Sequence, residues 1–335
     1  MKKYGHYVAL EWAKANMAIA RMSGMSEKVN TIDVPSDIDD LKLYLKRLGG
    51  SKILTFEETT TSQWLYTELR SYVDDIIICD PRRNKLLSDG AKNDIADAKK
   101  LVTLLRNGLL KEVYHSSDRF IRLRKIVSGY DDLIKSGVRL KNQRDSFLRS
   151  VGKSTEKDIN DRELKFVLDG IDRAINNYEA DKKRYEAMFK LLNKTNPEIR
   201  NQESISGIGY INSVKIISRV VDAERFKEKG DYFLYCGLLK YDKISGGRSY
   251  GKRTPRYSRQ LKCVYKTAAN AVLGGAGGNN YFYKYYEHLI KVRGFPEYQA
   301  RHALARKIAA VSYGIMRNGE KFNPIRRDND LTTDL

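Results

Sequence analysis

Short apolar runs and longer amphipathic stretches alternate along the first third of the chain. The apolar runs predict strands at residues 7–10, 17–22, 28–32, 52–56 and 75–79. Apolar positions recur at helical spacing in residues 36–48, 62–71 and 94–105. Three strands followed by alternating helices and strands indicate a mixed sheet with helices packed on it, which is an α/β fold.

Acidic residues occur where this predicted sheet ends. Glu11 follows the first strand and Glu57 ends the fourth, and open α/β sheets place their sites at the carboxyl ends of strands. Asp94 and Asp97 lie three residues apart, so both project from one face of their helix. Four carboxylates could therefore converge, and such oxygen ligands suit Mg²⁺ or Mn²⁺. The alternative is that Asp94 caps the helix and Asp97 is merely solvated.

The middle of the chain is predicted to be helical. From about residue 118 to residue 194, apolar residues recur at helical spacing, with a break near residues 152–155. Two long helices could form an antiparallel hairpin or pair between protomers as a coiled coil. The first helix is strongly basic, which favours phosphate contact, whereas the second mixes both signs and is typical of a solvated face. The candidate contacts on the first helix are Arg122, Arg139, Lys141 and Arg144.

The charge balance of the chain points to a polyanionic partner. Sixty-two Lys and Arg residues against 42 Asp and Glu residues give a formal net charge of +20. No apolar run approaches the roughly 20 residues needed to span a bilayer, and the first strand is too short for a signal-peptide core. We therefore expect a cytoplasmic protein. The three cysteines and four histidines show no spacing typical of a zinc site or a disulfide framework.

The basic charge is most one-sided in the C-terminal third. No acidic residue occurs between Asp242 and Glu287, which favours nucleic-acid contact over a solvated mixed face. Upstream, Gly207 and Gly209 lie in a turn that resembles a helix-hairpin-helix, in which backbone amides can approach a phosphate. The candidate basic contacts are Arg248, Lys252, Arg253, Arg256, Arg259 and Lys262.

Ser245 begins a glycine turn at the start of this basic segment. The sequence Ser245-Gly246-Gly247 can present a hydroxyl to a phosphate, and nearby guanidinium groups could stabilise the charge that develops there. A serine in such a turn is ordinarily only a turn residue. The residues alone leave both interpretations open.

Several of these segments resemble one known family. The strand acid at residue 11, Phe56-Glu57-Glu58-Thr59 and Lys92-Asn93-Asp94-Ile95-Ala96-Asp97-Ala98 resemble the RuvC-like domain of the DEDD transposases of the insertion sequence one-ten family, which includes the Piv/MooV DNA invertases. The order of residues 205–209, 235–238 and 245–247 is similar to the family's C-terminal domain. Glu11 stands where the family usually has Asp, and residues 256–262 lack the usual Gly-Asn.

The resemblance implies a fold and a mechanism. It implies a RuvC/RNase H-like α/β domain at residues 1–107, a helical coiled-coil linker at 108–196, a mostly α-helical transposase domain at 197–326 and a polar tail at 327–335. Glu11, Glu57, Asp94 and Asp97 would hold two Mg²⁺ or Mn²⁺ ions, and Ser245 would be the nucleophile that joins covalently to DNA. The implied partners are element-end and target DNA, a bridge-type guide RNA and further copies of the chain in a dimer or tetramer.

Two other functions are consistent with the residues. A metal-dependent, structure-specific RuvC-like nuclease would use the same carboxylates, with Ser245 as a turn residue only. A nucleic-acid-binding relative could also have lost its chemistry through the Glu11 and Gly-Asn changes.

Overall fold

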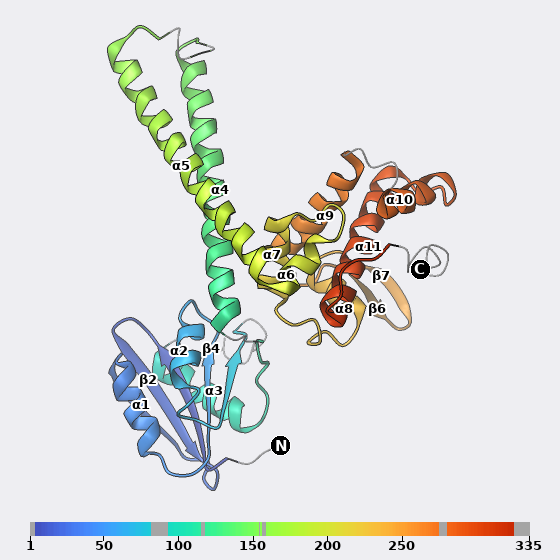
Figure 1. Cartoon of the computed structure of the whole chain (residues 1–335). Helices are drawn as coiled ribbons and strands as arrows, with labels where there is room; N and C mark the ends of the chain where they lie inside the picture. The colour runs from blue at the N-terminus through green and yellow to red at the C-terminus, as the bar shows by residue number, and fades with distance from the viewer. Residues whose placement is uncertain are drawn as a thin grey trace. The chain divides into compact units, whose positions relative to one another are not determined.

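The computed structural model describes residues 4–81, 93–114, 118–153, 155, 159–274 and 280–324. The chain divides into two compact units, Met1–Asp118 and Arg119–Leu335, and Figure 1 labels most of their elements. The polar tail predicted at residues 327–335 lies outside the described residues.

The first unit is built on one mixed sheet with the strand order β3-β2-β1-β4-β5. Strands β1 and β2 are antiparallel, as are β2 and β3, whereas β4 and β5 run parallel to β1. The predicted α/β fold is thus confirmed in its main features. The strands span His6–Trp12 (β1), Asn16–Ser23 (β2), Val29–Pro35 (β3), Lys52–Glu57 (β4) and Asp75–Cys79 (β5).

Helices cover both faces of this sheet. Alternate residues of β1 point to opposite sides, so Leu10 packs in a cluster with residues of α1 (Ile38–Arg47) and α2 (Ser62–Leu69). Ala9 packs in the cluster of the opposite face with Leu101 of α3 (Asp94–Arg106). Burial on both faces explains why β1 and β4 read as continuous apolar runs in the sequence.

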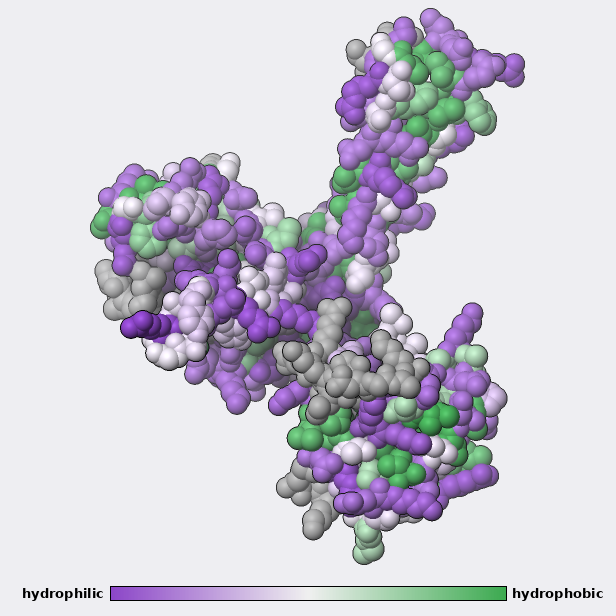
Figure 2. Space-filling model, turned by 180° about the vertical axis from the view of Figure 1, so that it is seen from behind, coloured by the Kyte–Doolittle hydropathy of each residue, from purple (hydrophilic) through white to green (hydrophobic). Residues whose placement is uncertain are grey.

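The second unit begins with a long helical hairpin. Helices α4 (Asp118–Ser150) and α5 (Arg162–Thr195) run side by side, as Figure 1 shows, so the antiparallel arrangement is confirmed. Tyr130 of α4 packs edge-on against Phe189 of α5, with ring centroids 5.0 Å apart. Figure 2 shows apolar side chains gathered at the end where the two helices are joined, over a shaft that is mostly hydrophilic.

Six further helices and one hairpin make up the rest of the described second unit. The core is centred on α11, whose Leu304, Ile308 and Val311 are fully buried among the other helices. A buried polar network links Tyr265, Ser312 and Gln202 inside this core. The helices span Pro197–Glu203 (α6), Tyr210–Val220 (α7), Lys229–Tyr235 (α8), Arg259–Gly274 (α9), Tyr281–Lys291 (α10) and Glu297–Asn318 (α11).

The segment after α8 contains two strands that the sequence analysis did not predict. Residues Tyr241–Ser245 (β6) and Arg248–Arg253 (β7) form a two-stranded antiparallel hairpin before α9 begins. Every residue of both strands is exposed. The C-terminal unit is therefore mostly helical with one exposed β-hairpin.

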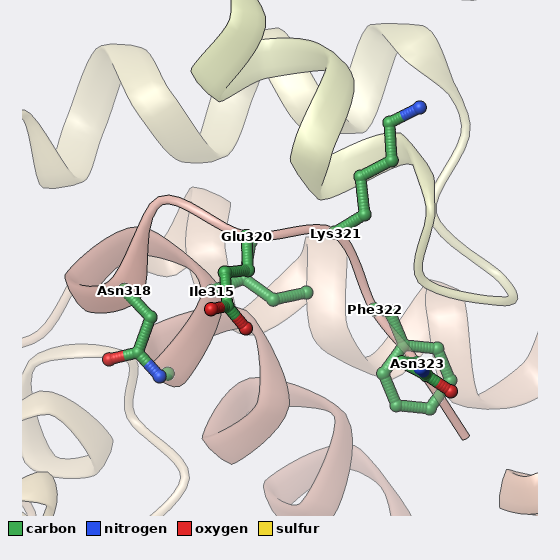
Figure 3. A pocket seen from close by; sticks show the side chains of 7 residues that line it. Ile315, Asn318, Glu320, Lys321, Phe322 and Asn323 are labelled. Carbon is green, nitrogen blue, oxygen red and sulfur yellow. The ribbon is translucent and has the colours of Figure 1, made fainter. Parts of the chain in front are cut away.

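A shallow hollow lies where the chain leaves α11 (Figure 3). Phe322 stacks on Phe282 with ring centroids 5.3 Å apart, and its backbone amide donates a hydrogen bond to Ser204 Oγ. Asn201 Nδ2 donates to the Gly319 carbonyl. These contacts attach the C-terminal segment to α6 and α10, so the hollow is a packing seam. Among the described residues, no helix is both long enough and apolar enough to span a membrane.

Candidate active site and nucleic-acid interface

The strand-ending acids meet at one edge of the first unit's sheet. Leu10 of β1 is paired with Phe56 of the parallel strand β4, and Glu11 and Glu57 are the next residues along each strand. Neighbouring strands lie about 4.8 Å apart. Glu57 is in turn paired with Cys79, after which Asp80 follows. The topology therefore brings three acids to adjacent positions on the carboxyl edge.

Helix α3 supplies two more carboxylates. Asn93 caps the helix, because its side chain accepts a hydrogen bond from the Ala96 amide at 2.7 Å. The alternative that Asp94 is the cap is therefore wrong. Asp97 lies one turn along and is half-buried, with its Oδ1 atom 3.7 Å from Lys100 Nζ. That atom is buried and has no hydrogen-bond partner among the described residues, so it is an oxygen available to a cation.

The acids of the strands and of the helix share one electrostatic environment. Burial raises the pKa of Glu11 to about 8, and the negative charges of Glu57, Asp97 and Asp94 add to the rise. Burial also raises the pKa of Glu57, with further contributions from Asp97 and Asp80. Like charges at such close range penalise ionisation, and a bound cation would remove that penalty. Perturbed carboxylates of this kind are concentrated at functional sites.

The donor set fits a hard divalent cation. All four predicted ligands provide carboxylate oxygens, which Mg²⁺ and Mn²⁺ prefer. Within the described ranges, no three His, Cys, Asp or Glu side chains are already arranged to hold a metal ion. The fold brings Glu11 and Glu57 to the same edge of the sheet, and the charges of Asp94 and Asp97 act on Glu11.

Sequence reasoning missed Asp80. This residue follows β5 directly, is only 5% exposed, and contributes to the raised pKa of Glu57. The rule that singled out Glu11 and Glu57, an acid at the end of a buried strand, applies equally to Asp80. Its backbone amide donates to the Lys111 carbonyl at 3.0 Å, which fixes the strand end in place.

Two aromatic side chains at the same edge were also missed. Trp12 follows Glu11 directly and meets Trp64 of α2 edge-on, with ring centroids 5.4 Å apart. Trp64 is 42% exposed. These are the only two tryptophans in the chain, so intrinsic tryptophan fluorescence reports on this edge of the sheet.

Ser245 lies at the tip of the exposed hairpin in the second unit. Gly246 and Gly247 have φ angles of 56° and 76°, a backbone conformation that favours glycine in a two-residue type I′ turn. Ser245 is paired directly with Arg248 across this turn, so the two side chains project from the same face of the hairpin. The hydroxyl is thus presented to solvent beside a guanidinium.

The predicted basic contacts around Ser245 form a largely exposed set. Arg248, Lys252 and Arg253 belong to β7, while Arg256, Arg259 and Lys262 lie before and within α9. Lys262 Nζ lies 4.6 Å from the centroid of the Tyr257 ring. Lys252 Nζ lies 4.0 Å from Asp242 Oδ1 across the hairpin. The set as a whole is suited to a phosphate backbone.

The basic residues of α4 divide into two groups. Lys141 pairs with Glu179 at 2.7 Å, and Arg144 pairs with Asp172 at 2.6 Å, both on α5. These two ion pairs link α4 to α5 across the helical hairpin. Arg122 and Arg139 are exposed on the same helix.

The two glycines of the predicted helix-hairpin-helix turn have different surroundings. A Cβ atom on Gly207, which has a φ of +88°, would lie 2.5 Å from the Ala268 carbonyl of α9. Gly207 is therefore needed for helix packing. Gly209 is exposed and precedes α7, with open space around the position of a Cβ.

Comparison with known families covers both units. A transposase family model, that of the IS110 DEDD transposases, matches residues 8–152 and so includes all four predicted acids. A second, described as Transposase IS116/IS110/IS902 family, matches residues 200–287 and includes Ser245. No curated protein matches the sequence. DEDD transposases are typically metal-dependent DNA recombination enzymes. The chain therefore belongs to the IS110 family of DEDD transposases.

Proposed function

We propose that this transposase is an RNA-guided recombinase that cuts and rejoins DNA through a covalent phosphoserine intermediate. The observation that carries the proposal is the convergence of Glu11, Glu57, Asp94 and Asp97 on one electrostatic site. The strand order of the sheet supports a RuvC/RNase H-like catalytic domain at residues 1–107. We propose residues 108–196 as a linker and 197–326 as the domain that provides the nucleophile.

The four acids are proposed to hold Mg²⁺ or Mn²⁺, in two positions. When bound, such ions stabilise negative charge on a reacting phosphate and activate the attacking oxygen. The protein's contribution is to keep Glu11 partly buried and the other acids nearby, so that ionised carboxylates are unfavourable without a cation. Asp97 Oδ1 supports this role, because it is buried and makes no hydrogen bond to the described residues, with Lys100 Nζ 3.7 Å away.

Ser245 is proposed as the nucleophile. Its Oγ atom forms a bond to a DNA phosphorus while the bond from phosphorus to the 3′ oxygen breaks. The hydroxyl proton is given up, and the departing 3′ oxygen takes a proton to become a free hydroxyl. The exposed position of Ser245 and its pairing with Arg248 support this role, because a guanidinium beside the serine can stabilise the charge that develops on the phosphate.

The proposed partners are element-end DNA, target DNA and a bridge-type guide RNA, in the cytoplasm at the prokaryotic nucleoid. Base pairing would select the sequence while the protein reads backbone and shape. The basic residues on β7 and α9, together with Arg122, Arg139 and the Gly209 turn, are the proposed contacts.

We also propose that the chain acts as a dimer or tetramer. Phe166 and Val167 support this assembly, since they are 74% and 46% exposed near the joined end of the helical hairpin. Figure 2 shows the apolar character of this end. A second copy of the hairpin could cover these side chains.

A second candidate is a metal-dependent, structure-specific nuclease. The observation in its favour is that a type I′ turn already accounts for the glycines after Ser245. A catalytically lapsed relative is the third possibility, and metal-dependent DNA cleavage would exclude it.

Cleavage of labelled element-end DNA tests the proposal. Full-length protein is purified with and without RNA transcribed from the sequence flanking its gene, and is incubated with DNA and Mg²⁺. We expect cleavage that requires the metal and is increased by the flanking RNA. Cleavage that is equal without RNA and prefers branched DNA would support the nuclease instead.

A further inference from the structure

A pocket in the second unit is lined by residues other than those of the hairpin that carries Ser245. Its volume is about 480 Å³, and it is lined by residues of α8, α10 and α11, helices labelled in Figure 1. This volume falls within the roughly 300–1,000 Å³ range of small-ligand sites. Its lining contains no acidic residue among those described. The aromatic lining residues are Phe233, Tyr285 and Tyr313, and the cationic ones are Lys229, Arg306 and Lys307.

The aromatic part of the pocket is held rigidly. Tyr313 is 5% exposed, its ring stacks on Tyr232 with centroids 5.1 Å apart, and its hydroxyl donates to the Phe226 carbonyl at 3.2 Å. Tyr285 is 8% exposed, with Lys307 Nζ 5.4 Å from its ring centroid. These two rings are therefore fixed parts of the pocket wall, whereas the ring of Phe233 is partly exposed.

The pocket also adjoins a concentration of positive charge. His302 lies one turn before Arg306 on α11, and its pKa is lowered by burial and then by Lys266, Lys262, Arg306 and Lys240. Arg306 belongs both to this basic surface and to the pocket lining. A phosphate chain that follows the basic surface would therefore pass the mouth of an aromatic pocket.

We propose that this pocket binds one unpaired nucleotide of a nucleic-acid strand, with the base against the aromatic rings and its phosphate at the cations. Aromatic stacking combined with a basic track is the usual means of binding single strands. A base inside a duplex cannot enter such a pocket unless it is extruded. The inference rests on the proposed function and adds a site that acts in binding, separate from the chemistry at Ser245 and the acids.

The test uses oligonucleotides that contain 2-aminopurine, a base whose fluorescence changes on stacking. Full-length protein is titrated with single-stranded DNA, single-stranded RNA of the same sequence, and the corresponding duplex. Ala310→Phe fills the pocket without changing charge, and Tyr285→Leu removes one ring. Gln299→Phe is the matched control, because it adds the same ring to an exposed position of α11 outside the lining.

We expect wild type and Gln299→Phe to change the fluorescence of single strands. Ala310→Phe and Tyr285→Leu should abolish the signal and bind single strands about tenfold more weakly, with duplex binding unchanged. A larger response to RNA would assign the nucleotide to a guide, and a larger response to DNA would assign it to a substrate strand.

Single-strand signals that are unchanged in both pocket variants would overturn the inference and leave the proposed function intact. Wild-type protein that gives no single-strand signal but still cleaves DNA would overturn it as well. Wild-type protein that binds neither single strands nor duplex would overturn both the inference and the proposed function. Melting temperatures of the variants, measured alongside, identify any weakening that comes from unfolding.

Discussion

Glu11 and Glu57 occupy equivalent positions on neighbouring parallel strands, one residue beyond the Leu10–Phe56 pair. After burial, Glu57 makes the largest contribution to the raised pKa of Glu11. The fold thus places two carboxylates side by side, where the charge of one disfavours ionisation of the other. Two ionised carboxylates at this site repel each other at neutral pH, and a bound divalent cation would offset that repulsion.

The raised pKa of Glu11 makes metal-free stability depend on pH. A carboxyl whose folded pKa is about 8 and whose ordinary value is 4.5 holds its proton more tightly in the folded state. Its stabilising contribution is complete below pH 4.5 and is lost as the pH rises toward 8. In EDTA, we expect the melting temperature of wild type to fall relative to Glu11→Gln between about pH 5 and pH 8.

Differential scanning fluorimetry checks this prediction. Added Mg²⁺ should raise the melting temperature of wild type more at about pH 8 than at about pH 6, because the carboxylates must ionise to bind it. Melting curves for wild type and Glu11→Gln that stay parallel across the pH range would contradict the account.

Manganese should quench the fluorescence of Trp12 and Trp64. Mn²⁺ is paramagnetic, and a site that includes Glu11 would place it close to Trp12, the next residue in the chain. We expect saturable quenching in wild type and little in Glu57→Gln. Glu58→Gln is the matched control, because Glu58 is exposed. Equal quenching in all three proteins would show that the ion binds elsewhere.

Asp80 should act as a supporting residue of the metal site. It is buried beside Glu57 and raises the pKa of that carboxyl. Residues that surround metal ligands commonly affect metal affinity by about 10- to 100-fold when replaced. We expect Asp80→Asn to weaken the binding of Mn²⁺ about tenfold in the same fluorescence titration, less than Glu57→Gln does. An affinity equal to that of wild type would remove Asp80 from the site.

The basic residues of β7 should contribute to DNA affinity by neutralising phosphates. The slope of log K against log salt concentration becomes shallower by about 0.9 for every phosphate that the protein no longer neutralises. We therefore expect the combined substitutions Arg248→Gln, Lys252→Gln and Arg253→Gln to make the slope shallower by about 2 to 3. Fluorescence anisotropy at several salt concentrations measures it.

Lys141→Gln with Arg144→Gln is the comparison for that experiment. Both side chains already pair with acids of α5, so we expect this variant to keep the wild-type slope. If the α4 double variant changed the slope more than the β7 triple variant, the helical hairpin would be the main phosphate-binding surface.

The sequence predicted the sheet and the long helices well because burial imposes a period on the chain. The apolar run of β1 and the helical spacing in α4 and α5 follow directly from what each face packs against. The β6–β7 hairpin was not predicted, since every residue in it is exposed and no apolar pattern marks the strands. Its register comes from the two glycines of the turn.

The sequence predicted only part of the candidate site, because contacts between distant residues depend on the fold. Chain order and spacing suggested Glu11, Glu57, Asp94 and Asp97. Asp80 follows a predicted strand in the same way, but its place beside Glu57 depends on the pairing of β5 with β4. The internal pairing of Arg144 with Asp172 likewise depends on how α4 and α5 face each other. Charge sign is local information, whereas the partner of a charge is a property of the fold.

The role of Ser245 decides between a recombinase and a nuclease most directly. Purified protein, Mg²⁺, the flanking RNA and labelled element-end DNA are mixed and separated on a denaturing gel. Ser245→Ala is compared with Ser249→Ala, another exposed serine of the same hairpin, and with Asp94→Ala. The account predicts a covalent protein–DNA band in wild type and Ser249→Ala that is absent from the other two. DNA cut by Ser245→Ala as efficiently as by wild type, with no covalent band in either, would contradict it.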